Sequence, residues 1–572
     1  MKLILSFLKK YDIAIYVAYS LTLIELVSEL LFPFILGIMI NNGIMNENMD
    51  EIIKWGMIMF GITIISFTAG MTNSYISAHI SVSSAYDIRK KLFAAIQEFT
   101  FEQLSKYPTS ALVTRFTNDV RQIQNTVFMG LRIMVRAPLM VIGSVIMAFI
   151  VNPKISIVFL ITVPILIIFL FTVLNIGRKM FVRVQQNVDK VNLVIQENIA
   201  GMRVIKAFVR GKNENKRFSE ANETLARNTE KAFRFMESSM PVLMFIMNIS
   251  LVIILYVGHQ QIQIGTTSVG DVVAIVNYAL RTVMAISMFT FLTLAFARAT
   301  SSAERIAPIL EEKVDKPILK HDYTVKHGAI TFDQVNFTYP NDTVNVLQHV
   351  SFHIKPGETV AILGSTGAGK TTLFQLIPKL YTPTSGEIFL DDQPLHMYDT
   401  TNLRTQIGYV PQSPLLFTGT IRDNISFGKA DMSGTMLIKA AKDAQIHDTI
   451  TSFQHGYDTV VGQKGVNLSG GQKQRISIAR ALLLQPKILM LDDATSALDT
   501  KTEHLLLDAL RTYECTTLII TQKISTAKQA DNILLLDQGK VVDFANHATL
   551  LERSAFYQRI VESQAEREIS HE

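Results

Sequence analysis

Cysteine and charge are both scarce in this chain. Its 572 residues include one cysteine, Cys515, which excludes an intrachain disulfide and a zinc site built from several thiolates. Charged residues make up only 18%, and the net charge of +5 is small for this length. We therefore expect no nucleic-acid partner, and the excess of lysine and arginine needs another explanation.

Hydrophobic residues, in contrast, make up 48% of the chain, and the mean hydropathy is +0.26. That is too apolar for a soluble protein of this length, which is also too long for a single core. Six segments reach the length of about 20 residues that a helix needs to cross a membrane. They are Ile13–Ile40, Ile53–Ile80, Val127–Val151, Ile155–Ile176, Val242–Gly258 and Val272–Ala297.

The connections between these segments differ in charge. Residues 81–126 and 177–241 are long, helical in period and rich in lysine and arginine, so the positive-inside bias places both in the cytoplasm. The short connection Asn41–Glu51 carries three acidic residues and is expected outside. We predict a multi-pass protein of the cell membrane, in contact with lipid, with both termini in the cytoplasm.

The composition changes after the sixth segment. Residues 301–327 are polar and predict a linker, and from residue 328 onward strand patterns alternate with helix patterns, as in a soluble α/β domain. The expected domains are therefore a membrane domain over residues 1–300, a linker over 301–327 and a cytosolic domain over 328–572.

The second domain contains a glycine-rich phosphate-binding loop. An apolar stretch of strand length, Thr359–Leu363, precedes it and a helical pattern follows from Leu373 to Leu380, which is the context that the motif requires. In such a loop the backbone surrounds the phosphates, the lysine reaches the β- and γ-phosphates, and the next hydroxyl binds Mg²⁺. The predicted nucleotide-binding residues are Gly364, Ser365, Thr366, Gly367, Ala368, Gly369, Lys370, Thr371 and Thr372.

A second pattern for anion binding lies further along the chain. Ser469, Gly470, Gly471 and Gln472 precede a basic helical pattern, and the N-terminus of a helix can hold an anion. One nucleotide needs only one phosphate cradle, so a second cradle indicates that ATP is gripped from two sides.

With these motifs in this order, the chain resembles the ATP-binding cassette (ABC) exporters over essentially its whole length. The resemblance implies an all-α membrane domain of six helices followed by a cytosolic α/β P-loop nucleotide-binding domain. It also implies that Tyr339 stacks on adenine, and that Gln412 and Asp492 join Thr371 around Mg²⁺. Asp499 is implied in the loop that crosses to a second cassette.

The family resemblance also assigns a task to the two long cytoplasmic extensions. Their tips dock on the cassettes in that family and pass the movement of the cassettes to the membrane helices. We expect the tips near Thr109–Thr117 and Gly201–Arg210.

Two positions depart from the pattern of the family. Asp493 stands where the family has the glutamate that polarises the attacking water, and Gln522 stands where it has a histidine that touches the γ-phosphate. A carboxylate that is one methylene shorter is pulled back by roughly 1–1.5 Å, which costs about two orders of magnitude in rate where positioning dominates. Gln522 can donate a hydrogen bond but cannot become cationic. The alternative is that Asp493 is an adequate base and Gln522 a neutral change.

Within the family, this pair of departures resembles one half of a heterodimeric exporter. The resemblance implies a second, different half-transporter as partner, whose hydrolytic site is completed by Ser469 and the three residues after it. The implied substrates are hydrophobic or amphipathic compounds, as in multidrug exporters. Lipid and peptide exporters share this architecture, and a nucleotide-binding membrane regulator without transport is the alternative from another class.

Charged residues also occur inside the expected membrane spans. Glu25 and Glu29 lie four apart on one helix face of the first span, and Arg132 and Arg136 do the same in the third. A charge in lipid is costly unless it faces protein or water. The two glutamates therefore either line a cavity that attracts cationic amphipathic substrates or have a structural role. In that role they pair with arginines, or face water in the central cavity without selecting a substrate.

Overall fold

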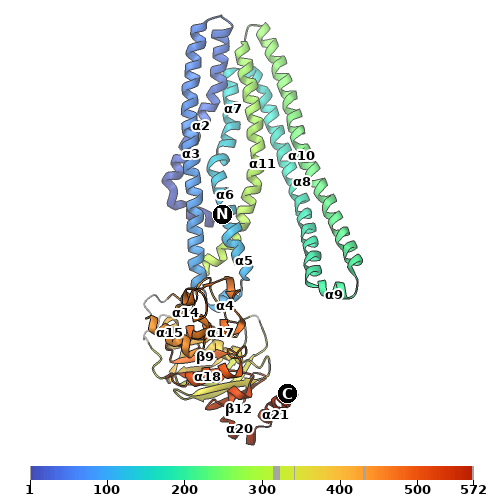
Figure 1. Ribbon diagram of the computed structural model, residues 1–572. Coiled ribbons are helices and arrows are strands. Elements are labelled where there is room, and N and C mark those ends of the chain that lie inside the picture. Colours follow the sequence, from blue (N-terminus) through green and yellow to red (C-terminus); the bar gives the residue numbers. More distant parts are fainter. Residues whose placement is uncertain (1, 313–322, 341, 429–432, 570–572) are drawn as a thin grey trace. The chain divides into compact units, whose positions relative to one another are not determined.

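The computed structural model describes residues 2–312, 323–340, 342–428 and 433–569 (Figure 1). The chain divides into two compact units. The first holds Met1–Glu98 and Tyr107–Lys313, and the second holds Phe99–Lys106 and Val314–Glu572.

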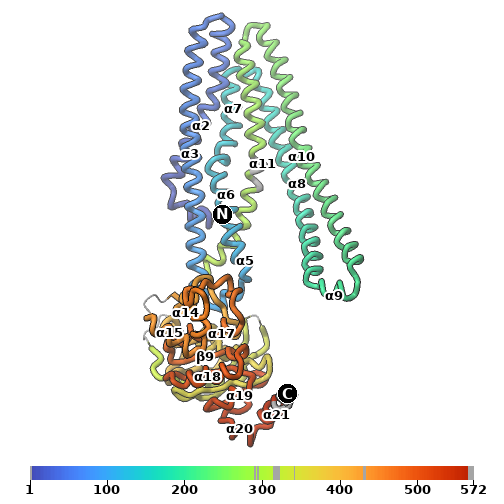
Figure 2. Tube along the Cα trace, viewed as in Figure 1, coloured from blue at the N-terminus to red at the C-terminus, as the bar shows by residue number. Residues whose placement is uncertain are grey.

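In the part of the first unit that the structure describes, every secondary-structure element is a helix (Figure 2). Two of its helices, α8 and α10, run side by side and are joined by the short helix α9 at one end (Figure 1). The elements of the unit are α1 (Lys2–Leu8), η1 (Lys9–Tyr11), α2 (Asp12–Ile38), η2 (Met39–Ile44), α3 (Met49–Glu98), α5 (Thr109–Thr114), η3 (Arg115–Asp119), α6 (Val120–Met129), η4 (Gly130–Met134), α7 (Arg136–Val151), α8 (Pro153–Ala200), α9 (Met202–Ala207), α10 (Gly211–Gln263) and α11 (Val269–Glu311).

Within the described residues, six helical segments are long and apolar enough to cross a membrane, which confirms the six predicted spans. Several of them continue far beyond the predicted ends, because the basic connections that follow are helical as well. The segments are Leu3–Ile44, Met49–Glu98, Thr109–Val151, Pro153–Ala200, Gly211–Gln263 and Val269–Met288.

The tight turn between the third and fourth spans shows how the sequence ends one helix and begins the next. Asn152 leaves the helical conformation after Val151, and its side-chain oxygen accepts from the N–H groups of Lys154 at 3.0 Å and Ile155 at 3.2 Å. Pro153 takes the first position of α8, where its missing N–H costs nothing. The chain therefore reverses within a few residues.

The chain between α3 and α5 contributes a short helix to the second unit. After α3 ends, Thr100 caps the short helix α4 (Phe101–Ser105), and its hydroxyl accepts from the N–H of Gln103 at 3.2 Å. Residues 99–106 belong to the second unit, where the Phe101 ring lies edge-on to Tyr381 with 5.5 Å between ring centroids. The expected tip Thr109–Thr117 forms α5 and part of η3 in the first unit, and its docking on a cassette stays a prediction.

The expected linker is also partly helical. α11 continues through Glu311, because polar residues that suggested a linker are bonded inside the first unit. The hydroxyl of Ser302 and the Nε of Arg305 each donate to Asp119 at 2.9 Å, and Asp119 is only 2% exposed. Residues 313–322 of the expected linker lie outside the described residues.

The second unit is built on sheets. Its six-stranded sheet has the order β12-β11-β3-β10-β9-β6, parallel throughout except for the edge strand β12, and a four-stranded antiparallel sheet has the order β2-β1-β4-β5. The strands are β1 (Ile330–Phe337), β2 (Leu347–Ile354), β3 (Thr359–Gly364), β4 (Ser385–Leu390), β5 (Gln393–Pro394), β6 (Ile407–Val410), β7 (Gly419–Thr420), β8 (Val460–Val461), β9 (Ile488–Asp492), β10 (Thr516–Ile520), β11 (Asn532–Asp537) and β12 (Lys540–Ala545).

Alternate residues of the parallel strands face two different cores. In β3, Val360 and Ile362 pack in the core shared with the antiparallel sheet, whereas Ala361 and Leu363 pack in a core with the C-terminal helices. The strands are buried on both faces, which explains why they appear in the sequence as continuous apolar runs. This arrangement confirms the predicted α/β domain.

Short helices surround the sheets of the second unit. α12 begins at Lys370 and ends before the predicted Leu380, because Pro378 has no N–H group to continue the helical hydrogen bonds. The helices and helical turns are α12 (Lys370–Leu376), η5 (Leu395–Met397), α13 (Thr400–Thr405), α14 (Ile421–Ser426), α15 (Gly434–Asp443), α16 (His447–Thr451), η6 (Gly456–Asp458), η7 (Gln463–Gly465), α17 (Gly470–Leu483), α18 (Thr500–Leu510), α19 (Ile524–Ala527), α20 (His547–Arg553) and α21 (Ala555–Ile569).

Candidate functional site

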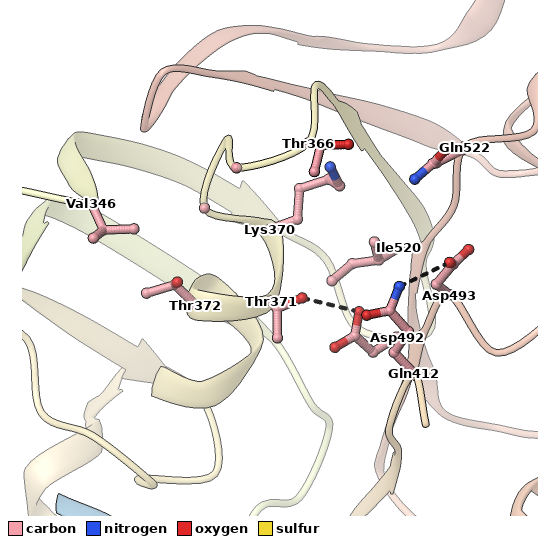
Figure 3. Close-up of a pocket in the computed structure, with 12 residues that line it drawn as sticks. Val346, Thr366, Lys370, Thr371, Thr372, Gln412, Asp492, Asp493, Ile520 and Gln522 are labelled. Carbon is pink, nitrogen blue, oxygen red and sulfur yellow. Dashed lines mark hydrogen bonds between the residues drawn. The ribbon is translucent and has the colours of Figure 1, made fainter. Parts of the chain in front are cut away.

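Four parallel strands of the six-stranded sheet lie next to one another in the order β3, β10, β9 and β6, and their carboxyl ends meet at one edge. Ligands of α/β folds bind outside such an edge. A cavity of about 280 Å³ opens there (Figure 3). It is lined by Val346, Thr366, Gly367, Gly369, Lys370, Thr371, Thr372, Gln412, Asp492, Asp493, Ile520 and Gln522.

The phosphate-binding loop connects β3 to α12. Gly369 caps the helix with a left-handed φ of +95°, and a Cβ added there would lie 2.8 Å from the Leu347 side chain, so only glycine fits. The Lys370 ammonium donates to the backbone carbonyls of Gly364 at 2.9 Å and Ser365 at 2.8 Å. Burial lowers the pKa of Lys370, while the nearby carboxylates of Asp492 and Asp493 oppose that shift. The lysine is therefore held within the loop, facing the cavity.

The residues that would hold Mg²⁺ lie together. The Thr371 hydroxyl donates to Asp492 at 3.3 Å, and Gln412 lines the same cavity. Burial raises the pKa of Asp492, an effect that the Thr371 hydrogen bond opposes and the charge of Asp493 reinforces. A hydroxyl, a carboxylate and an amide oxygen form the hard oxygen set that Mg²⁺ prefers, so the residues present fit the ion.

Asp493 follows β9 directly and turns the chain sharply. Its φ is +50°, which aspartate tolerates better than most residues, and its N–H donates to the Ile520 carbonyl at 2.9 Å. Its carboxylate accepts from the Gln412 side-chain amide at 3.2 Å (Figure 3). Asp493, which the resemblance places at the position of the general base, thus lies in the cavity and is hydrogen-bonded to Gln412, one of the residues that fit Mg²⁺.

Gln522 follows β10 and lines the cavity on the same side as Asp493 (Figure 3). Both departures from the family pattern therefore lie in one cavity with Lys370. The family resemblance implied that they share one reaction centre, and the pairing of β9 with β10 brings the two positions together.

One residue near the site was missed from the sequence. Gln564 of α21 donates through its amide nitrogen to the Gln522 carbonyl and accepts from the Ile524 N–H at 2.9 Å. Lys523, which lies between Gln522 and Ile524 in the sequence, forms an ion pair with Glu503 at 2.6 Å. These bonds hold the backbone of the Gln522 segment in place. Gln564 lies far along the chain in a polar segment, and only the fold reveals its position.

Tyr339 lies just after β1, but the described residues that line the cavity do not include it. Its ring is edge-on to Phe337 and Tyr381, with centroids 5.0 Å and 5.3 Å away. Its hydroxyl shares a hydrogen bond of 2.9 Å with Thr372 and donates to Gln375 at 3.1 Å. The stacking of Tyr339 on adenine stays a prediction.

The second anion-binding pattern starts α17. The Ser469 hydroxyl accepts from the Gln472 N–H at 3.3 Å, and the Gln472 side chain accepts from the Ser469 N–H at 2.9 Å. Ser469 and Gly470 are exposed, and a Cβ on Gly470 would meet nothing within 4 Å. These residues and Gly471 lie apart from the described lining of the cavity.

Asp499 caps α18, and its carboxylate accepts from the Thr502 N–H at 3.0 Å. That hydrogen bond lowers the pKa of Asp499. Like the residues before α17, it is exposed and not part of the described cavity lining. Its crossing to another cassette stays a prediction.

The two intramembrane glutamates lie in the first unit, and both pair with an arginine. Arg136 donates to Glu25 at 2.8 Å and, through its other terminal nitrogen, to Glu29. Both glutamates also line a second cavity, of about 380 Å³, to which Arg132 contributes. Pairing with arginine and lining a cavity were alternatives from the sequence, and the structure combines them.

Comparison with known families agrees with this architecture. The family model described as "ABC transporter transmembrane region" matches residues 15–286, and the one described as "ABC transporter" matches residues 347–496. A "bacterial Atm1-family ABC exporter with ATP bound" has a similar fold, with a TM-score of 0.80, 23% identity and 98% of both chains covered.

Similar sequences extend over nearly the whole chain. The "Uncharacterized ABC transporter ATP-binding protein YfiB" of Bacillus subtilis (strain 168) is 50% identical over 99% of this chain and 98% of its own length. An "ATP-dependent lipid A-core flippase" of Syntrophus aciditrophicus (strain SB) is 32% identical over 89% of this chain and 85% of its own length.

Proposed function

We propose that this chain, which belongs to the ABC transporter family and is an ATP-driven exporter, exports amphipathic compounds. We propose further that it does so as one half of a heterodimer. In this proposal, the chain's own P-loop site binds ATP but hydrolyses it slowly. Its signature residues, Ser469 to Gln472, complete the faster site of a different half-transporter.

The observation that carries the proposal is the pairing of Asp493 and Gln522 in one cavity with Lys370. The expected binding groups Lys370, Thr371 and Asp492 all line the cavity. The two positions to which the resemblance assigns contact with the attacking water and the γ-phosphate carry a shorter acid and a neutral amide. Both changes affect hydrolysis and spare binding. A slow site that still binds ATP is the simplest consequence.

Mg²⁺ would be held by Thr371, Asp492 and Gln412, and when bound it neutralises charge on the phosphate oxygens. Lys370 adds a cation at the phosphates, and the backbone N–H groups of the loop from Ser365 to Gly369 orient them. In the proposal, Gln522 donates a neutral hydrogen bond where the family has a histidine.

The signature residues support a role toward another molecule. Ser469 and Gly470 are exposed at the start of α17, away from the described lining of the chain's own cavity. The helix N-terminus carries free N–H groups that suit a phosphate. We propose that they contact ATP on the partner subunit, and that Asp499 lies at the same interface.

The proposed substrate is an amphipathic or hydrophobic compound. Drug-like compounds and lipids both fit this description, and one relative carries a lipid flippase name. We propose the cell membrane as the location, with both termini and the ATPase domain in the cytoplasm, where ATP is found. This orientation rests on the lysine and arginine content of the long connections.

Two measurements test the proposal. ATP turnover of the purified chain, verified as a homodimer, should be low, and it should rise when a partner with glutamate and histidine at the two positions is co-purified. The reconstituted pair should move an amphipathic compound in an ATP-dependent way. Fast turnover by the homodimer would contradict the two-subunit proposal, and nucleotide-dependent conformational change without flux would favour a regulator.

A further inference from the structure

The cavity around Glu25 and Glu29 is a polar site within the membrane-spanning part of the first unit. It measures about 380 Å³ and lies where α2 packs beside α3 (Figure 1). Glu25 is roughly 20 Å along α2 from Asp12, which is near the middle of a hydrocarbon layer about 30 Å thick. The cavity is lined by Glu25, Glu29, Phe32, Thr63, Ser66, Phe67, Gly70, Met71, Ser74 and Arg132.

Two carboxylates in this cavity share a single arginine. Arg136 donates to one oxygen of Glu25 and to one oxygen of Glu29, and the three side chains are 25%, 13% and 27% exposed. The second oxygen of each carboxylate accepts no hydrogen bond from a described residue. The three groups therefore carry one excess negative charge and two free acceptor oxygens.

Arg132 supplies the opposite charge. It lies one turn before Arg136, in η4, and lines the cavity. Among the described residues, its guanidinium has no hydrogen bond and no carboxylate within ion-pair distance. A cation without a counter-charge inside the membrane is costly. A ligand with an anionic group would pair with the Arg132 guanidinium and remove that cost.

The remaining wall combines hydroxyl groups and apolar surface. Thr63 and Ser74 donate their hydroxyl hydrogens to carbonyls of their own helix at 2.8 Å, which leaves their oxygens as acceptors. Phe67 and Met71 are 63% and 61% exposed and form an apolar surface beside the charged groups. The site therefore offers acceptors, one free guanidinium and an apolar surface together.

We propose that this cavity binds the zwitterionic head group of an amphipathic molecule. Its ammonium contacts the free oxygens of Glu25 and Glu29, its phosphate contacts Arg132, and its apolar tail lies along Phe67 and Met71. A purely cationic head group leaves Arg132 unpaired, and a purely anionic one meets the excess carboxylate charge. The assignment deepens the proposed function, on which it rests, by naming the substrate class.

The test measures binding to the full chain in a nonionic detergent, without nucleotide. Trp55 is the only tryptophan and lies on α3 about two turns before Thr63, so its fluorescence can report a titration. The probes are dihexanoyl phosphatidylethanolamine, dihexanoyl phosphatidic acid and a dihexanoyl trimethylammonium-propane, which share their tails and differ in head-group charge.

The zwitterionic probe should bind at least about tenfold more tightly than the other two. Arg132→Gln should weaken it by about tenfold and shift the preference toward the cationic probe, whereas Arg132→Lys retains part of the affinity. Glu29→Gln should weaken it too. Arg281→Gln, an arginine of α11 outside the described cavity lining, is the matched control and should change nothing.

Equal affinity of Arg132→Gln and the unchanged chain for the zwitterionic probe would overturn the assignment, as would stronger binding of either singly charged probe. The readout needs neither ATP turnover nor a partner. If the zwitterionic probe does not bind the unchanged chain while the reconstituted pair still shows ATP-driven flux, only this binding site is contradicted. If the probe binds as expected while the homodimer hydrolyses ATP fast, only the heterodimer is contradicted.

Discussion

At the scale of single residues, the chemistry of the nucleotide cavity depends on where short side chains can reach. The Asp493 carboxylate accepts a hydrogen bond from the Gln412 amide at 3.2 Å, and the Asp493 backbone is in the left-handed conformation. An aspartate anchored in this way has little freedom to approach an attacking water. Gln522 nearby cannot supply a positive charge.

We therefore expect Asp493→Glu alone to raise ATP turnover of the homodimer less than about threefold, because Gln522 remains. Combining it with Gln522→His should raise turnover by about tenfold or more. Steady-state phosphate release measures this, with nucleotide affinity as the control that binding is unchanged. Turnover typical of an intact exporter from Asp493→Glu alone would show that Gln522 does not matter.

Asp492 allows a test through its pKa. Burial raises the pKa of its carboxyl, so ionised Asp492 costs folding stability, and that cost appears as pH rises through the raised pKa. Asp492→Asn should therefore raise the melting temperature of the nucleotide-free chain at neutral pH, by about 1–3 °C. The difference should shrink as pH is lowered, because Asp492 then becomes neutral as well.

The same variant should lose the stabilisation that Mg²⁺ and ATP together confer, since it lacks the anionic oxygen ligand. Thermal melts with and without Mg²⁺–ATP measure both effects. A variant that is destabilised without nucleotide at neutral pH would contradict the sign of the argument.

Gln564 is a positioning residue, since it touches the backbone on both sides of Lys523. Gln564→Ala removes two hydrogen bonds, so amide exchange of residues 522–524 should become about tenfold faster, and nucleotide affinity should change little. Gln558→Ala is the matched control: it lies on the same helix, and the one hydrogen bond of its side chain to a described residue goes to the Leu551 carbonyl, at 2.7 Å. Unchanged exchange in Gln564→Ala would remove its positioning role.

At the scale of secondary-structure elements, the first unit depends on close approaches between helices. The clearest is between α2 and α11, where a Cβ added to Gly270 would lie 2.1 Å from the Gly37 carbonyl oxygen. Asn41 secures the same contact: it accepts from the Gly270 N–H at 2.8 Å and donates to Asp271 at 3.2 Å. Two backbones touch here because neither glycine has a side chain.

Gly270→Ala should therefore destabilise the chain by about 1–3 kcal/mol, since the backbone of α2 must move. Gly56→Ala on α3, where an added Cβ meets nothing within 4 Å, is the matched control and should be neutral or slightly stabilising. Thermal melts of the detergent-purified variants measure the difference. Equal melting temperatures for the two variants would show that α2 and α11 do not pack this closely.

At the scale of the whole molecule, the proposal requires asymmetry between two subunits. The chain's P-loop residues and its signature residues act on different nucleotides if each ATP is bound between subunits. Substitutions in the P-loop residues should then affect the chain's slow site, and substitutions in the signature residues should affect the partner's fast site.

In the co-purified pair, Ser469→Ala of this chain should reduce ATP turnover by about tenfold or more, because the fast site loses a hydrogen-bond donor. Lys370→Ala should reduce it less, since it damages the slow site. Ser452→Ala is the matched control, since Ser452 is exposed and its hydroxyl, among the described residues, bonds just the Thr449 carbonyl. A larger loss from Lys370→Ala than from Ser469→Ala would reverse the assignment of the two sites.

Local patterns determined much of this protein. Apolar length determined the six spans, and the spacing of glycines, lysine and hydroxyl between a strand and a helix determined the phosphate loop. These features depend on residues close together in the chain, where periodicity and turn chemistry act directly. The departures at Asp493 and Gln522 were visible only by comparison with the family pattern, with the strands before them locating the two positions.

Only the tertiary structure decided which distant residues meet. The order of β3, β10, β9 and β6 gathers the motifs around one cavity, and Gln564 reaches the Gln522 segment from the last helix. Arg136 rather than Arg132 binds the two glutamates. Asp119 accepts a hydrogen bond from Arg305, which fixes the polar end of α11 within the first unit. Such pairings depend on packing between elements far apart in sequence. The periodicity of a single segment indicates which of its faces is apolar, but not which element packs against that face.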